Sequence, residues 1–146
     1  MSEDKLTKGQ AARIILETTI VQEEKVFRNT FDEMGRIVSM NDHYYLRFVE
    51  EDDSGKIPTV IKISSEGTVT VIRHSENKTH LEFDEETDTY TNYQTPAGLM
   101  KMRVKTSRIN LSYQGSPFAG EVEVDYHIYN KEIELGTYQI RLRFTT

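Results

Sequence analysis

The sequence predicts an all-β protein of about ten antiparallel strands, folded as an up-and-down barrel or a sandwich. Apolar and polar side chains alternate along many short segments, as they do in strands that bury one face. Thr and Tyr are frequent and apolar runs at helical spacing are missing, which favours strands over helices. The segments are joined by hairpin-sized links, and no βαβ unit of a nucleotide-binding fold is visible.

Chain length and composition indicate the number of domains, the cellular location and the kind of partner to expect. A chain of 146 residues is expected to form one domain over residues 1–146, with the polar residues 1–10 disordered or frayed. The absence of cysteine fits a reducing compartment, and neither a signal peptide nor a membrane span is visible, so a cytoplasmic protein is expected. The net charge of −6 argues against a nucleic-acid partner.

The first hairpin is predicted at residues 11–21 and 26–33. The apolar faces of these segments coincide when Ile20 lies opposite Phe27, as a hairpin over one core requires. Gly35 is expected to break the second strand with a bulge or a turn. The next expected strands cover residues 44–48, 57–64, 68–75 and 80–83, with an acidic, turn-rich loop at 50–56.

The stretch from Thr89 to Tyr113 is the part around which the rest of the chain is expected to be organised. A turn at Thr95–Gly98 precedes a strand whose side chains alternate with a period of two. A second turn, at Thr106–Ser107, is expected to place Ile109 opposite Val104. In the strand between the turns, Met100, Met102 and Val104 are expected to be buried, and Lys101, Arg103 and Lys105 exposed.

The last hairpin is predicted at residues 121–129 and 135–144. A one-residue slip would expose its apolar side chains at roughly 1.5–3 kcal/mol each, so only registers two residues apart compete. Cross-strand charge pairs favour Glu123 opposite Arg141, with Glu121 opposite Arg143. This register also places Tyr126 against Tyr138.

Catalytic and metal sites have little support in the sequence. Nucleophilic catalysis lacks a cysteine and a Gly-x-Ser-x-Gly motif, and the four histidines are scattered. His74, His80 and Glu82 are ligand types for zinc, but the apolar parity of their neighbours turns them towards solvent. We therefore expect no catalytic residue, no metal and no cofactor, and an enzyme is the weakest hypothesis.

Two charged stretches have structural explanations. The run Glu82–Asp88 lacks the spacing of a calcium loop and is expected to be a solvated connection. The stripe Lys101, Arg103 and Lys105 could follow a phosphate backbone, but aromatic residues do not cluster beside it. A salt-bridged outer face, with Glu121, Glu123 and Asp125 nearby, is favoured instead.

Arg73 is the most informative single residue. By parity it shares the inward face of Val71, Leu81 and Phe83, so we expect it inside or at the rim, with a carboxylate, a hydroxyl or carbonyls in reach. It is either a structural ion-pair residue or an anchor for an anionic ligand group. The tyrosines expected to line the same lumen or rim are Tyr90, Tyr93, Tyr126 and Tyr138.

Five motifs carry a family resemblance: Val69-Thr-Val71-x-Arg73, Leu81-x-Phe83, Tyr93-x-Thr95-Pro96-x-Gly98, Thr106-x-x-Ile109 and Asp125-Tyr126-x-Ile128. Over about residues 11–144 the chain resembles the YwiB-like calycin-like β-barrel family of low-GC Gram-positive bacteria. Leu81 and Ser75 depart from it, standing where the family tends to have Met and the Gly of an Arg-x-Gly turn. The resemblance implies a bacterial, lipocalin-like up-and-down barrel of about eight to ten strands, without an assigned activity.

Three function hypotheses remain. The favoured one is a barrel that binds a small ligand, partly apolar or anionic, in its lumen. The alternative is a structural or protein-interaction barrel whose lumen is filled by its own side chains, acting through its surface or as a homodimer. An enzyme is the third.

Overall fold

The computed structural model describes residues 6–53, 55–75 and 78–146 and has one antiparallel sheet of ten strands. The predicted all-β, antiparallel fold is thereby confirmed. In chain order the strands are β1 (Gln10–Gln22), β2 (Lys25–Met40), β3 (His43–Asp52), β4 (Gly55–Ile63), β5 (Val69–Arg73), β6 (Thr79–Phe83), β7 (Thr89–Thr95), β8 (Gly98–Gln114), β9 (Ala119–Asn130) and β10 (Ile133–Thr145).

The sheet forms a nearly closed up-and-down barrel. Except for β6 and β7, strands that follow one another in sequence pair, and β1 also pairs with β10. Among the described residues, the junction of β6 with β7 has no backbone ladder. There the Thr91 hydroxyl donates to the carbonyl of His80 at 2.8 Å, and the Thr89 hydroxyl donates to the carbonyl of Glu82. Two side-chain hydrogen bonds therefore bridge this junction, where the backbone does not.

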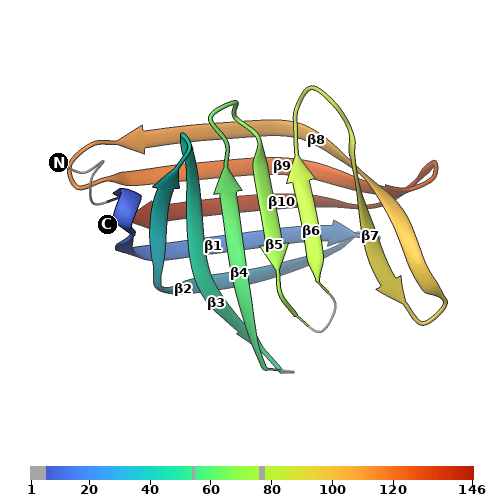
Figure 1. Ribbon diagram of the computed structural model, residues 1–146. Coiled ribbons are helices and arrows are strands. Elements are labelled where there is room, and N and C mark those ends of the chain that lie inside the picture. Colours follow the sequence, from blue (N-terminus) through green and yellow to red (C-terminus); the bar gives the residue numbers. More distant parts are fainter. Residues whose placement is uncertain (1–5, 54, 76–77) are drawn as a thin grey trace.

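Two layers of strands cross each other in the barrel (Figure 1). The long strands β8, β9, β10, β1 and β2 run side by side, and the shorter β3 to β6 cross them at a steep angle. The long strands extend beyond the short ones at the end that carries the β1–β2, β7–β8 and β9–β10 turns.

The space between the layers holds an apolar core. Leu6, in a short helical turn before β1, is 3% exposed and belongs to that core. The expectation of a frayed segment is therefore wrong for residues 6–10, and residues 1–5 lie outside the described residues. No helix in the described residues is long and apolar enough to cross a membrane. The largest fully buried side chains include Phe83, Phe144, Ile14, Ile37, Leu46, Ile61, Ile63, Ile128 and Leu142.

The predicted registers of the first and last hairpins are confirmed. Ile20 lies opposite Phe27 in the β1–β2 pair. Glu123 lies opposite Arg141 in the β9–β10 pair, in the same register that the charge pairs predicted. In both hairpins the alternation of apolar and polar residues was sufficient to determine which face is buried.

The strand after the turn at Thr95–Gly98 has the predicted parity. Val104 is buried and Lys101 and Lys105 are exposed, whereas Arg103, also expected to be exposed, is half-buried. The inward-facing side chains nearer to the turn are only half-buried, because this part of β8 belongs to the longer end of the barrel. Those side chains are Met100 and Met102.

Strand β8 continues through Thr106–Ser107, so the turn predicted there is wrong. Its pairing with β9 shifts by one residue between Thr106 and Arg108, which is a β-bulge. The extra residue changes the side-chain parity, and Val104 and Ile109 both contribute to the core. A bulge and a tight turn change the alternation in the same way, which explains the mistaken prediction.

Gly35 lies inside β2, so the break predicted there is wrong as well. It is opposite Ala12 of β1, and β3 begins to pair with β2 at the next residue, Arg36. A Cβ atom on Gly35 would lie 2.6 Å from the carbonyl oxygen of Arg47 and 2.6 Å from Cδ1 of Ile14. Glycine is needed here because three strands approach closely, and not because the chain turns.

Candidate ligand-binding site at one end of the barrel

Arg73, the last residue of β5, lies half-buried near one end of the interior. Its Nε donates a hydrogen bond to Oε1 of Glu50 on β3 at 3.3 Å. The two side chains are 28% and 16% exposed. The prediction that Arg73 lies inside or at the rim with a carboxylate in reach is confirmed, and the pairing offsets the penalty of burying its charge.

The pair lies at this end because two inward rows of side chains change there from apolar to polar. On β3 the buried Phe48 precedes Glu50 in the inward row, and on β5 the buried Val71 precedes Arg73. Strand β4 lies between β3 and β5 and pairs with both. The two rows therefore reach the barrel rim close together, where each supplies one charge of the ion pair.

A stack of aromatic rings crosses the interior beside this pair. The rings of Tyr126 on β9 and Tyr138 on β10 are nearly parallel, with centroids 4.9 Å apart. Phe83 on β6 contacts the Tyr126 ring at a centroid distance of 4.4 Å. Because the long strands β9 and β10 and the short strand β6 belong to different layers, these ring contacts join the two layers across the interior.

Electrostatic effects link Arg73 to the tyrosines. Burial raises the pKa of Tyr93 and of Tyr126, and the positive charge of Arg73 opposes both shifts without cancelling them. Both phenols therefore stay protonated at neutral pH and can donate hydrogen bonds. The Tyr138 hydroxyl accepts a hydrogen bond from Nε2 of Gln22 at 3.1 Å. Three of the four tyrosines predicted for this space are thus placed together with Arg73.

Tyr90 does not belong to the site, so its predicted position in the lumen or rim is wrong. It lies opposite Arg103 in the β7–β8 pair, on the outer face, and is 58% exposed. Nζ of Lys101 lies 4.6 Å from the centre of its ring, a cation–π contact. Tyr90 and Tyr93 are three residues apart in one strand, so they point to opposite faces.

Two residues of the site were missed by the sequence analysis. Glu50 was assigned to an acidic loop, but β3 extends to Asp52, so Glu50 is still in the strand. Its parity with Leu46 and Phe48 is the signal that could have identified it. Gln22 was assigned to no site, and only the β1–β10 pairing brings it near Tyr138.

In the described part of the chain, histidines and carboxylates do not come together in a group that could hold a metal ion. His74, His80 and Glu82 are all exposed, on the side that the sequence parity assigned to them. Exposed ligand types without supporting neighbours have nothing to hold them in coordination geometry.

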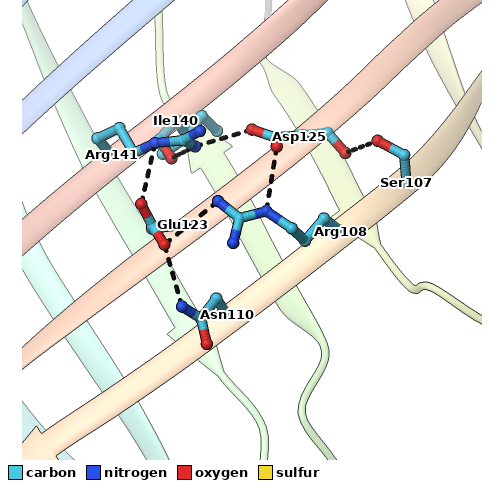
Figure 2. A network of polar contacts seen from close by, with 7 residues as sticks. All are labelled: Ser107, Arg108, Asn110, Glu123, Asp125, Ile140 and Arg141. Atoms are coloured by element: carbon cyan, nitrogen blue, oxygen red, sulfur yellow. Dashed lines mark hydrogen bonds and ion pairs between the residues drawn. The ribbon is translucent and has the colours of Figure 1, made fainter.

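A network of ion pairs occupies the outer face of β8, β9 and β10 (Figure 2). Arg108 lies 3.2 Å from both Glu123 and Asp125, and Arg141 lies 3.2 and 2.8 Å from the same two carboxylates. Arg103 of the basic stripe lies 2.8 Å from Asp88. The outer face is salt-bridged as predicted, but the partners differ: Glu123 and Asp125 pair with Arg108 and Arg141, and Arg103 of the basic stripe pairs with Asp88.

Two surface hollows adjoin the site. One, of about 460 Å³, includes Tyr93 and Thr79 in its lining. The other, of about 430 Å³, is lined by Gln22, Phe27 and Leu135 among others. Each shares one residue with the cluster or with its hydrogen bonds, and Arg73 lines neither of them.

Comparisons with known proteins identify the fold and the family. The family described as "Domain of unknown function (DUF1934)" matches residues 14–142. The crystal structure of ywiB protein from Bacillus subtilis superimposes with a TM-score of 0.80, 19% identity and coverage of 97% of this chain and 95% of that chain. At that identity the likeness shows the fold alone.

A structural genomics protein of unknown function from Bacteroides ovatus is a much weaker match. Its TM-score is 0.38 at 10% identity, over 94% of this chain and 41% of that chain, so it supports no argument. No curated protein matches the chain.

Proposed function

The chain belongs to the family of the DUF1934 domain, whose description names no activity, so we propose a function from the site alone. The protein binds a small, partly apolar ligand that carries an anionic group, at the Arg73 end of its barrel. The anionic group pairs with the guanidinium, and the apolar part lies against the aromatic rings. No covalent chemistry is assigned to the site.

The observation that supports this proposal is the convergence of Arg73 with Tyr93, Tyr126 and Tyr138. These residues come from four strands, β5, β7, β9 and β10, and meet at one partly open end of the interior. Ligand pockets commonly combine aromatic walls with a few polar groups that fix orientation. A purely structural ion pair would not need phenol groups around it.

The free side of Arg73 indicates how the anion would bind. Glu50 contacts only Nε, and no described residue is bonded to the two Nη groups. A carboxylate or sulfonate approaching end-on can accept both Nη hydrogen bonds in the bidentate geometry that arginine favours. The ligand would then add to the Arg73–Glu50 pair and need not displace Glu50.

The aromatic stack limits how deep a ligand reaches. Phe83, Tyr126 and Tyr138 contact one another across the interior, so the ligand is proposed to bind at the mouth of the barrel and not deeper. The same stack supports the second candidate, a structural or protein-interaction barrel with a side-chain-filled lumen. We also propose a cytoplasmic location, which the absence of cysteine supports.

A pair of fluorescent probes tests the binding function. 1-Anilinonaphthalene-8-sulfonate carries a sulfonate, and N-phenyl-1-naphthylamine is the same ring system without it. We expect the sulfonate to bind roughly 10-fold more tightly, as one charge-assisted contact implies. Arg73→Gln should abolish that preference, whereas Arg47→Gln, the same change at an exposed outward position, should keep it.

Two outcomes would reject the ligand site. Equal affinity of both probes for the wild-type protein would remove the role of the anionic group, and so would an unchanged preference in Arg73→Gln. Native mass spectrometry of gently purified protein complements the titration, because a bound small molecule would appear as added mass. Failure of both measurements would leave the side-chain-filled barrel as the better explanation.

A further inference from the structure

Strand β2 has one unpaired edge along much of its length. On one side β1 pairs with it from Lys25 to Ile37, but on the other side β3 pairs only from Arg36 to Met40. Figure 1 shows β3 turning away and leaving the rest of β2 at the margin of the long-strand layer. Within the described ranges, no strand covers the edge from Val26 to Met34.

The turn geometry identifies which residues have their backbone groups on this edge. Glu23 and Glu24, with φ of 48° and 68°, form a two-residue turn, so Gln22 and Lys25 form a hydrogen-bonded pair. From Lys25 onwards, odd-numbered residues of β2 bond to β1. Even-numbered residues direct their N–H and C=O groups to the edge, consistent with the pairing of Arg36 with β3.

The exposed edge is regular and partly apolar. Val26 and Met34, near its two ends, are 53% and 63% exposed. Natural proteins protect such edges with proline, bulges or cover, and the stretch from Val26 to Met34 has neither a proline nor a register shift against β1. Its charged side chains, Arg28, Asp32 and Glu33, oppose non-specific association, but a strand with complementary charges can still pair with an edge of this kind.

We propose that the edge of β2 pairs antiparallel with the same edge of a second copy of this chain, with the two-fold axis at Thr30. In this register Thr30 faces Thr30 of the second copy, Arg28 faces Asp32, and Val26 faces Met34. Oppositely charged and apolar side chains each meet their complement on the outer face. All five edge-facing residues also find backbone partners.

Other registers match less well. An axis at Asn29 places Val26 opposite Asp32, and an axis at Phe31 places Arg28 opposite Met34. Each of them pairs only four of the five edge-facing residues within the strand. The sequence complements itself around Thr30, which favours a second copy over an unrelated extended peptide.

The contacts already present around the edge are compatible with this pairing. Asp32 forms a bidentate ion pair with Arg13 of β1, with a shortest distance of 2.7 Å, so it would lie between two guanidinium groups in the dimer. On the inner face Phe27 would lie opposite Glu33, which adds no specific attraction. None of these residues belongs to the Arg73 site, so the dimer goes beyond the proposed binding function.

Sedimentation equilibrium over a concentration series tests association directly. We expect a dimer of twice the monomer mass of 17.0 kDa. Thr30→Pro removes an N–H that faces the edge left unpaired by the described strands, and should raise the dimer dissociation constant roughly 10- to 100-fold. Thr30→Val keeps the N–H group and the β-branched shape, so it should remain dimeric. Circular dichroism should show all three proteins folded.

Single cysteines test the register, because the wild-type chain has none. Thr30→Cys should form a disulfide-linked dimer under mild oxidation, since opposite Cα atoms of a hydrogen-bonded pair are about 5.5 Å apart. Arg28→Cys should not, because the two cysteines would be about 14 Å apart. A monomer at every concentration, or cross-linking at Arg28→Cys instead of Thr30→Cys, would overturn the proposal.

Discussion

Glu50 lies 3.3 Å from Nε of Arg73 and leaves the outer end of the guanidinium without a partner among the described residues. The two charges come from different inward rows, and each terminates an otherwise apolar series. The pair is therefore held by the core on one side and open on the other. The Glu50 carboxylate stabilises the charged Arg73 guanidinium, as the proposed binding of an anionic ligand requires.

Replacing Glu50 should strengthen anion binding. Glu50→Gln removes a negative charge beside Arg73, so the affinity for 1-anilinonaphthalene-8-sulfonate should rise about 3- to 10-fold. N-phenyl-1-naphthylamine should bind unchanged. Fluorescence titration of both probes measures the difference, and a lower sulfonate affinity in Glu50→Gln would contradict the role of Arg73 as anchor.

Gly35→Ala should destabilise the fold strongly. The new Cβ would lie 2.6 Å from the carbonyl oxygen of Arg47, and backbone cannot move aside without disturbing the β2–β3 junction. We expect a loss of about 2–4 kcal/mol in the free energy of unfolding, measured by urea titration. Gly115→Ala is the matched control, because a Cβ there meets nothing within 4 Å, and its change should stay within about 0.5 kcal/mol.

The same substitution at two buried threonines should have opposite effects. Thr91 and Thr106 are 5% and 6% exposed, but only Thr91 has a hydrogen-bond partner for its hydroxyl. Thr91→Val should lower the free energy of unfolding by about 1–2 kcal/mol, because it leaves the carbonyl of His80 unpaired at the β6–β7 junction. Thr106→Val should be neutral or stabilising. Equal losses in thermal denaturation would show that the junction does not depend on this bond.

Acidification should weaken the outer ion-pair network. Burial raises the pKa of Asp125, but the pairs with Arg141 and Arg108 outweigh it and hold the pKa below its usual value of 3.8. A lowered folded-state pKa contributes stability above pH 3.8 that is lost as the pH falls through the folded value. Asp125→Asn should therefore reduce the fall in melting temperature between about pH 5 and pH 2. An unchanged fall in melting temperature in Asp125→Asn would contradict the role of this carboxylate.

Side-chain parity explains which parts of the fold could be predicted. Wherever a strand is regular, the burial of alternate residues determines its face, so the registers of Ile20 with Phe27 and of Glu123 with Arg141 followed from sequence. The same reasoning failed at local irregularities. The bulge after Thr106 was predicted as a turn, because both change the alternation of apolar and polar side chains in the same way. Gly35 was misread for a different reason, since nothing in the sequence reveals the approach of Arg47 from a third strand.

The candidate site could be predicted only in part. Parity placed Arg73 inside, but its partner Glu50 lies on a strand that was predicted to end earlier. Which tyrosines approach Arg73 depends on how far the barrel curls, and that is a property of all ten strands. Tyr90 could have been excluded, because it differs in parity from Tyr93 on the same strand.

The pairing of β1 with β10 has a consequence for synthesis of the chain. Every other strand pair joins neighbours in sequence, whereas this one joins residues as distant as Arg13 and Thr145. At a translation rate of roughly 5–20 residues per second, the hairpins from β1 to β6 can form while one side of β1 still waits for its partner. Until the final strand leaves the ribosome, the nascent protein is thus an open sheet in which one edge of β1 is unpaired. Chaperone protection is most valuable during those seconds, because an unpaired strand edge can associate with other chains.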